Sequence, residues 1–206
     1  MTLKEIRATT TPMEIREATE ETPATIEGYA LKFNKSSEPM GFGDYRFREQ
    51  IDPHALDKAD LSNVVALFNH DQSQVLGRTG VNLDLSVDET GLRYVLTPPN
   101  TSLGKDLVEN VRAGIISQSS FAFTIPDNSD AQKWTRDGDA DAPYNRLIRS
   151  IDHIYDVSPV TTPAYPDTEV KVGSRSLDAI KALDTPPEWQ EQRQKLLKKS
   201  LLEGLE

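Results

Sequence analysis

Apolar residues in this chain come in short runs that are separated by polar stretches containing glycine or proline. Thr25–Phe33 has strand character, and Val81–Val87 alternates apolar with polar residues, a period of two that indicates a half-buried strand. Gly91–Leu96 resumes the apolar pattern after the turn residues at 88–90. This spacing predicts a hairpin formed by residues 81–87 and 91–96.

Three further apolar runs predict strands, at residues 64–68, 115–125 and 147–157. The stretch between the last two, residues 127–143, is polar and contains glycine, so we expect it to form a mobile surface loop.

Two segments of this middle part have helical patterns. Lys105–Ala113 places its leucine and valine residues on one helical face, and Gly114 follows as a C-terminal stop. Pro53–Ala59 is expected to form a short helix with Asp52 as its N-cap. With roughly six to eight strands, two or three helices and no regular β-α-β alternation, the pattern predicts an α+β domain built on an antiparallel sheet or barrel.

The two ends of the chain differ from its middle. Residues 1–23 are rich in threonine and glutamate, and we expect either a short strand or a flexible N-terminal arm. Residues 24–176 form the expected compact domain, and residues 177–206 the expected helical C-terminal tail, which either packs on the domain or docks elsewhere. The leucines that repeat at four-residue steps in this tail are Leu197, Leu201 and Leu205.

Composition narrows the class of protein. The 206 residues carry a formal net charge of −10, and an acidic surface repels phosphate backbones, so nucleic acid is not expected as a direct partner. The lack of cysteine excludes a disulfide framework, a thiol nucleophile and a thiolate zinc site. The charged start of the sequence does not resemble a signal peptide, and no window reaches the roughly 20 apolar residues of a membrane span. We therefore expect a globular protein with no membrane partner and no cofactor.

The three residue types that a serine hydrolase needs occur in strand-like surroundings. His70 comes directly after one expected strand, Ser120 lies inside another, and Asp156 is near the end of a third. A serine hydroxyl becomes an effective nucleophile when an imidazole takes its proton and a third group holds that imidazole in the right tautomer. The order histidine, serine, aspartate is neither that of chymotrypsin nor that of subtilisin.

The surroundings of Ser120 fit this chemistry. On a strand, Phe121 and Phe123 share one face, and Ser120 shares the other with Ala122. The small Ala122 would leave room beside the hydroxyl for a substrate carbonyl group.

Other residues could fill the same roles, and each candidate taken alone also has an ordinary structural explanation. His54 or His153 could be the base, and Ser117 or Ser119 the nucleophile. The adjacent side chains at 70–71 face opposite sides of a strand, so they could not easily share a metal ion. The sequence has no phosphate-binding glycine loop and no Gly-x-Ser-x-Gly elbow, which disfavours a small esterase or lipase.

A series of short motifs, specific in order and spacing, decides between these candidate residues and functions. They are Gly28-Tyr29-Ala30 with Phe33-Asn34, Asn69-His70-Asp71 followed by Leu76-Gly77-Arg78, Gly91-Leu92, Gly114 ahead of Ser120-Phe121-Ala122-Phe123, and Asp156-Val157-Ser158-Pro159-Val160 ahead of Pro163-Ala164-Tyr165-Pro166. Through these motifs, residues 26–176 resemble the prohead maturation proteases of tailed bacteriophages.

The resemblance carries expectations for the fold and the site. It implies an α+β fold with an antiparallel β-barrel core flanked by a few helices, like that of the herpesvirus assemblins, and it makes residues 24–176 a serine protease domain. His70 matches the family's general base and Ser120 its nucleophile. Asp156 falls where the family has an acidic residue, often glutamate, and would be the orienting acid.

The resemblance also implies a function. We expect an endopeptidase that works inside the procapsid, in the host cytoplasm, and cleaves the major capsid protein's scaffolding segment or a separate scaffold protein. Self-association and cleavage of the enzyme itself, between Arg175 and Pro187, are expected as well. The alternative is a catalytically silent scaffold or assembly protein with the same fold.

Overall fold

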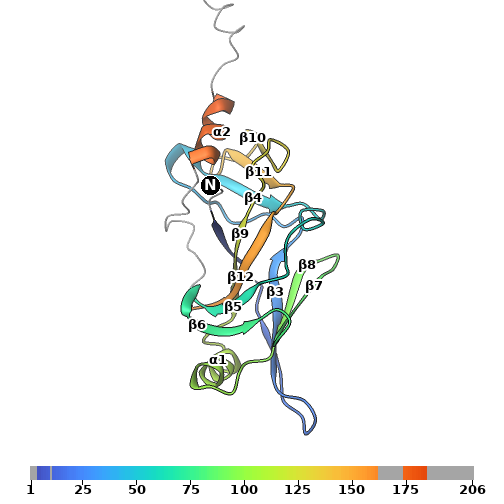
Figure 1. The fold of residues 1–206 in the computed structure, drawn as a ribbon. Helices are drawn as coiled ribbons and strands as arrows, with labels where there is room; N and C mark the ends of the chain where they lie inside the picture. Colours follow the sequence, from blue (N-terminus) through green and yellow to red (C-terminus); the bar gives the residue numbers. More distant parts are fainter. Residues whose placement is uncertain (1–3, 10, 162–173, 185–206) are drawn as a thin grey trace, which may run out of the picture. The chain divides into compact units, whose positions relative to one another are not determined.

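The computed structural model describes residues 4–9, 11–161 and 174–184 (Figure 1). The chain divides into two compact units, Met1–Lys171 and Val172–Glu206. The described part of the second unit is helix α2 (Ser174–Asp184). The tail helix expected over residues 189–205 lies outside the described residues. Within the described ranges, no helix is both long enough and apolar enough to cross a membrane.

The described part of the first unit consists mostly of strands, joined by one α-helix and one short 3₁₀ helix. In chain order the elements are β1 (Glu5–Thr9), β2 (Glu14–Arg16), β3 (Thr25–Lys32), η1 (Gly43–Tyr45), β4 (Phe47–Ile51), β5 (Val65–Phe68), β6 (Asp71–Arg78), β7 (Leu83–Val87), β8 (Gly91–Leu96), α1 (Ser102–Arg112), β9 (Gln118–Thr124), β10 (Gln132–Thr135), β11 (Tyr144–Ile148) and β12 (His153–Val160).

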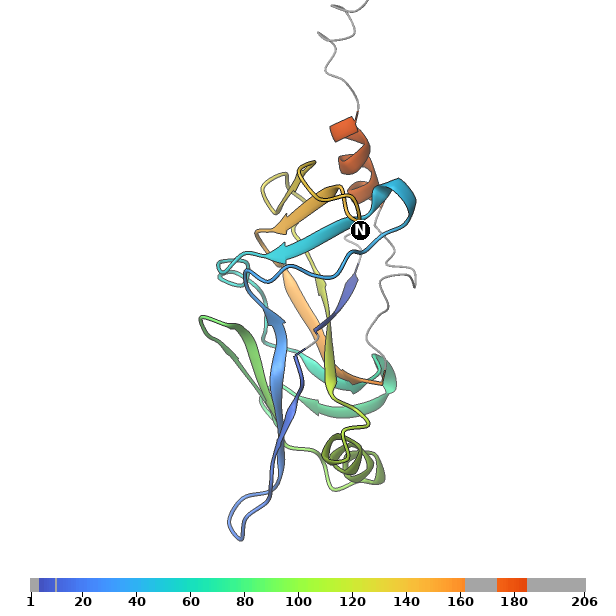
Figure 2. The ribbon, with the colours of Figure 1, turned by 180° about the vertical axis from the view of Figure 1, so that it is seen from behind.

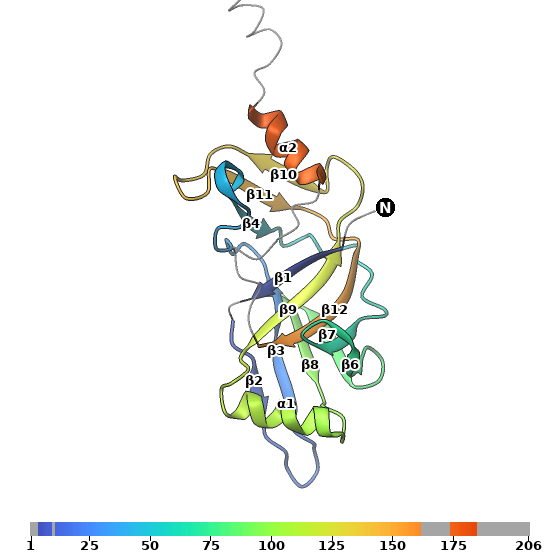
Figure 3. The same cartoon turned by 90° about the vertical axis from the view of Figure 1, so that its left-hand side faces the viewer.

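These strands form three sheets, which Figures 2 and 3 show from two further sides. The largest has the order β1-β9-β12-β5-β6, and only its β12–β5 pair is parallel. The second, β2-β3-β8-β7, is antiparallel throughout, and the third, β10-β11-β4, contains a parallel β11–β4 pair. The α+β class is confirmed, but the core is not antiparallel throughout, because two of the three described sheets each contain one parallel pair. No sheet closes on itself among the described strands, so the barrel stays a prediction.

The main core lies where the five-stranded and four-stranded sheets contribute side chains to one apolar cluster. Phe121 and Phe123 come from β9, Leu31 from β3, and Leu92 and Leu96 from β8, and none is more than 2% exposed. Each such side chain contributes roughly 1.5–3 kcal/mol by leaving water. Because one face of β9 packs into this core, the side chains on its other face are available for a functional site.

Most of the predicted elements are present. Residues 81–87 and 91–96 form the expected hairpin as β7 and β8, and the expected strand at 25–33 is β3. The expected helix is α1, and the Thr101 side chain caps it by accepting a hydrogen bond from the Gly104 amide.

Three local predictions were wrong. The single strand expected at residues 147–157 is two strands, because β11 ends at Ile148 and β12 begins at His153. Residues 53–59 form consecutive turns instead of a helix, because their backbone bonds, such as the one from Ala55 N to Asp52 O, span only three residues. The expected loop at 127–143 contains strand β10, which pairs with β11 and places Trp134 with its ring centroid 4.9 Å from that of Phe47.

The segment 1–23, expected as a short strand or an arm, contains two strands. β1 pairs antiparallel with β9, and β2 pairs with β3. The pairing places Ala8 opposite Ser120, so this segment lies next to the candidate nucleophile. The boundaries at 23 and 176 stay predictions.

Candidate active site

His70, Ser120 and Asp156 lie in contact, although they are far apart in the sequence. His70 Nε2 is 2.6 Å from Ser120 Oγ, and His70 Nδ1 is 2.5 Å from Asp156 Oδ1. The imidazole therefore bridges a hydroxyl and a carboxylate, one on each ring nitrogen. This is the arrangement in which a histidine can take a serine proton while an acid fixes its tautomer.

Strand β9 presents Ser120 as its sequence pattern predicted. Phe121 and Phe123 are buried in the core and stack with ring centroids 5.1 Å apart, so Ser120 and Ala122 occupy the opposite face. On the neighbouring strand β12, Ser158 stands directly opposite Ser120.

A β-bulge in β12 turns Asp156 toward this face. The pairing with β9 shifts between Ile154 and Asp156, so Tyr155 is the extra residue. Ile154 and Val157 both lie in the core although they are three residues apart, which an uninterrupted strand would not allow. The bulge thus reverses the alternation and directs Asp156 and Ser158 to the side of Ser120.

His70 is presented by a tight turn between β5 and β6. Asn69 and His70 have positive φ angles of 52° and 60°, and they are the two residues between the paired Phe68 and Asp71. Positive φ at both central residues is what a type I′ hairpin turn requires. Residues other than glycine adopt this conformation at a cost, so the backbone holds His70 in a strained position at the site.

The turn is also tied to β12. Asn69 N donates to the carbonyl oxygen of Pro159, and Asn69 Oδ1 accepts a hydrogen bond of 2.9 Å from Thr161 N. These bonds join the end of the strand that carries Asp156 to the turn that carries His70.

Asp156 as a whole residue is only 1% exposed, and both of its carboxylate oxygens have partners. Oδ1 accepts from His70 and from the Ser158 hydroxyl at 3.0 Å, and Oδ2 pairs with Lys4 Nζ at 3.0 Å. Burial alone would raise the pKa of Asp156, but the hydrogen bond and charge of His70, and then those of Lys4, hold it below its usual value. The acid is therefore ionised at neutral pH.

The Ser120 hydroxyl has a second partner. Its Oγ lies 3.0 Å from the carbonyl oxygen of Arg7 on β1, to which it can donate. A hydroxyl has one proton, so donation to Arg7 and donation to His70 exclude each other. Attack on a substrate requires the orientation toward His70.

A buried ionic cluster anchors β1 beside β9. Arg7 Nε contacts Glu49 Oε1 at 2.8 Å, and Arg146 contacts Glu49 Oε2 at 2.7 Å and Glu5 Oε1 at 2.8 Å. Burial alone would raise the pKa of Glu5, but Arg146 and then Arg7 outweigh it and lower the pKa to about 2. Glu5 and Arg7 alternate with Ile6, so the cluster lies on the face of β1 away from the candidate site.

The other two histidines lie in different surroundings. His54 Nδ1 pairs with Asp57 at 3.1 Å on the surface, and His153 Nδ1 pairs with Asp60 at 3.3 Å. In the described part of the chain, neither ring makes a hydrogen bond to a serine. No group of three histidine, cysteine, aspartate or glutamate side chains within those same ranges could hold a metal ion.

Ser119, the neighbouring candidate, faces the other way. Its hydroxyl lies 2.6 Å from the hydroxyl of Tyr94, in the core between the sheets. Burial raises the pKa of Tyr94 to about 12, so this tyrosine stays neutral and its bond to Ser119 is structural.

Two residues of the site were not among the sequence candidates. Ser158 could have been found, because residues two apart on a strand share a face and Asp156 is two residues before it. Lys4 gave no signal, since nothing local indicates that it would pair with Asp156.

Two comparisons show known proteins to which this chain is similar. The family of caudovirus prohead serine proteases matches residues 11–182. Among solved structures, the chain is similar to the bacteriophage T4 capsid assembly protease gp21, with 15% identity, a TM-score of 0.45, and coverage of 78% of this chain and 98% of that one. No curated protein matches the sequence.

Proposed function

Since the chain belongs to the caudovirus prohead serine protease family, we propose that it cleaves capsid and scaffold precursors, with Ser120 as nucleophile, His70 as general base and Asp156 as orienting acid. The observation that carries the proposal is the continuous set of contacts from Asp156 Oδ1 through both ring nitrogens of His70 to Ser120 Oγ.

The geometry supports a two-step acyl transfer. Ser120 Oγ attacks the carbonyl carbon of the scissile peptide while His70 Nε2 takes the hydroxyl proton. Asp156 holds Nδ1–H and stabilises the imidazolium, which then gives its proton to the leaving amine. A water molecule attacks the acyl-enzyme in the same way, with His70 as base, and restores the Ser120 hydroxyl.

The substrates follow from the family. We infer that the chain acts on the scaffolding segment of the major capsid protein or on a separate scaffold protein, inside the procapsid in the host cytoplasm, and that it self-associates there. We place self-cleavage between residues 175 and 187. Residues 175–184 lie in helix α2, not in the flexible stretch that the sequence predicts, so the helix would have to unfold before it is cut. This segment would separate the protease domain from the tail with its leucine repeat.

The test is co-expression with the capsid precursor of the same phage, read by intact mass spectrometry. The wild type should shorten the precursor and Ser120→Ala should not, while the control Ser117→Ala should behave as the wild type. A second readout is labelling of the purified full chain by a fluorophosphonate probe, which should be lost in Ser120→Ala.

The outcomes separate the alternatives. Cleavage by Ser120→Ala would mean that another residue is the nucleophile. If neither the capsid precursor nor the probe reacts with the wild type, the chain is a silent assembly protein with the fold of a protease. The mass of the protease itself, recorded in the same spectra, tests self-cleavage between residues 175 and 187.

A further inference from the structure

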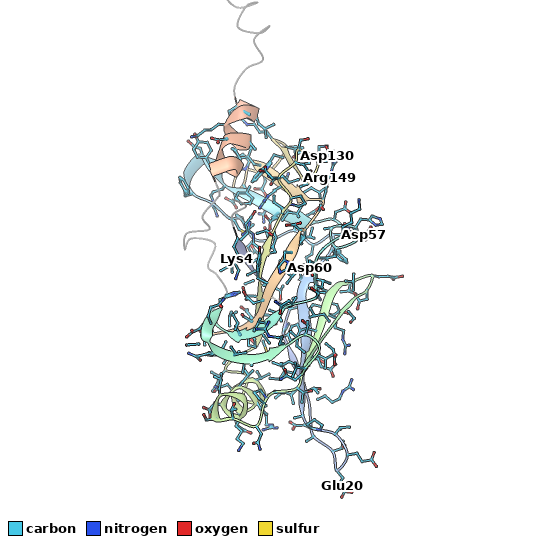
Figure 4. The ribbon with its side chains drawn as sticks, in the orientation of Figure 1. Lys4, Glu20, Asp57, Asp60, Asp130 and Arg149 are labelled. Carbon is cyan, nitrogen blue, oxygen red and sulfur yellow. The ribbon has the colours of Figure 1, made fainter. Side chains whose placement is uncertain are left out.

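Lys4, which is labelled in Figure 4, pairs with Asp156 but is not one of the three residues to which we assign the chemistry. It directly precedes β1, and its Nζ lies 3.0 Å from Asp156 Oδ2, the carboxylate oxygen that does not contact His70. The same ammonium lies 5.0 Å from the centroid of the Tyr155 ring, the residue bulged out of β12. These two contacts hold Lys4 beside the carboxylate oxygen of Asp156 that does not contact His70.

The position of Lys4 is set by buried structure. β1 is registered against β9 with Glu5 opposite Phe123, and the Glu5 carboxylate is held by Arg146 in the ionic cluster. The Lys4 side chain is 39% exposed, whereas that of Asp156 is 2% exposed. The ammonium therefore stays near water while it contacts a carboxylate that has almost no access to water.

The other groups around the His70–Asp156 pair are neutral or face elsewhere. Ser120 and Ser158 contact the pair as hydroxyls. Asp71, next to His70 in sequence, accepts hydrogen bonds from Ser73 and Gln74. On β1, Glu5 and Arg7 belong to the cluster on the opposite face of the strand. Of the charged groups that the described residues bring to this pair, Lys4 is the one in direct contact.

We propose that Lys4 is a positioning residue of this site: its ammonium fixes Asp156 Oδ2 and sets the pH at which the His70–Asp156 pair takes up a proton. The proposal rests on the proposed function, because it assigns Lys4 a part in that reaction. A positive charge beside the pair disfavours a further proton on either member. Lys4 thereby keeps His70 able to accept the serine proton at lower pH.

The direction of the effect follows from the charge. Without Lys4, the carboxylate is less neutralised and the pair binds its proton more tightly, so protonation begins at higher pH. Because the ammonium is partly exposed to solvent, we expect a shift of about half a pH unit to one unit and not the larger value of a fully buried pair. The acid limb of the pH–rate profile should move upward by the same amount.

The variants are Lys4→Met, which removes the charge, and Lys4→Arg, which keeps it. Lys32→Met is the matched control, because Lys32 also lies over a tyrosine ring, 5.2 Å from the centroid of Tyr29, but contacts no residue of the site. The ring proton of His70 is followed by NMR against pH in the full chain. The sequence has three histidines, so His54→Gln and His153→Gln complete the assignment.

Lys4→Met should move the protonation midpoint of the pair upward, Lys4→Arg should restore it, and Lys32→Met should leave it unchanged. An unchanged midpoint in Lys4→Met overturns the proposal. A shift in Lys4→Arg as large as that in Lys4→Met also overturns it, because it would mean that the shape of the side chain matters and not its charge. The NMR titration needs no catalysis. Failure of the fluorophosphonate probe to label the wild type would therefore count against the proposed function alone, and the midpoint would still decide the role of Lys4.

Discussion

The hydroxyl of Ser158 lies 3.0 Å from Oδ1 of Asp156, two residues earlier on β12, and 3.3 Å from Nδ1 of His70. It therefore supports the contact through which, in the proposed mechanism, Asp156 orients His70. We expect Ser158→Ala to lower the rate of probe labelling by roughly 10-fold or more, because one hydrogen bond to a charged group contributes about 1.5–3 kcal/mol. Ser86→Ala on the exposed face of β7 is the control. A labelling rate equal to that of the wild type would show that Ser158 is dispensable.

Asp156→Asn tests the acid. The amide keeps the size of the side chain but loses the charge that stabilises the imidazolium, so we expect the rate to fall by roughly 10²–10⁴-fold. Asp60→Asn is a suitable control, because Asp60 also pairs with a histidine, His153, at 3.3 Å. The rate is measured by stopping the reaction with the fluorophosphonate at a series of times. A fall in this rate of less than about threefold would show that Asp156 is not the orienting acid.

The turn at Asn69 permits a test of backbone strain. Asn69→Gly keeps a residue that accepts positive φ but loses the bond to Thr161, whereas Asn69→Ala loses both. Alanine in this conformation costs about 1–2 kcal/mol, so stability and activity should decrease from wild type through glycine to alanine. Thermal unfolding and probe labelling measure both. If Asn69→Gly and Asn69→Ala have the same melting temperature and labelling rate, the left-handed backbone at residue 69 does not determine the position of His70.

The ionic cluster predicts a dependence of stability on pH. The pKa of Glu5 is lowered from 4.5 to about 2 by folding, so its stabilisation is complete above pH 4.5 and is lost as the pH falls toward 2. At full effect this amounts to about 3 kcal/mol. Glu5→Gln should lower the melting temperature at pH 7, and the difference from wild type should shrink below pH 4.5.

Glu14→Gln, which removes an exposed carboxylate on β2, is the control for the general effect of charge. A gap between wild type and Glu5→Gln that stays constant from pH 7 to pH 3 would contradict the role of the cluster.

The parts of the site that depend on local alternation could be predicted from the sequence. Phe121, Ala122 and Phe123 are enough to indicate which way Ser120 points, because a regular strand has a period of two. The same logic fails at β12, since a regular strand through Ile154 would turn Asp156 toward the core. The bulge at Tyr155 turns Asp156 away from the core, and no local sequence pattern predicts this bulge.

Features that join distant segments could not be predicted. The pairs Lys4–Asp156 and Glu49–Arg146 are 152 and 97 residues apart, and each depends on the register of several strands. β10 was missed for a related reason. Three of its four residues are polar, and it forms a strand because it pairs with β11 and because Trp134 contacts Phe47.

The place of β12 between β9 and β5, where it pairs in parallel with β5, has a consequence for when the site forms during synthesis. His70 and Ser120 leave the ribosome first, but the strand that carries Asp156 is made last and must insert between β9 and β5, which are already complete. Translation proceeds at about 5–20 residues per second, so the unfinished chain exists for seconds without its acid. Until that strand has been made, the unfinished chain lacks the residue to which we assign the orientation of His70, so we expect it to have little of the proposed activity.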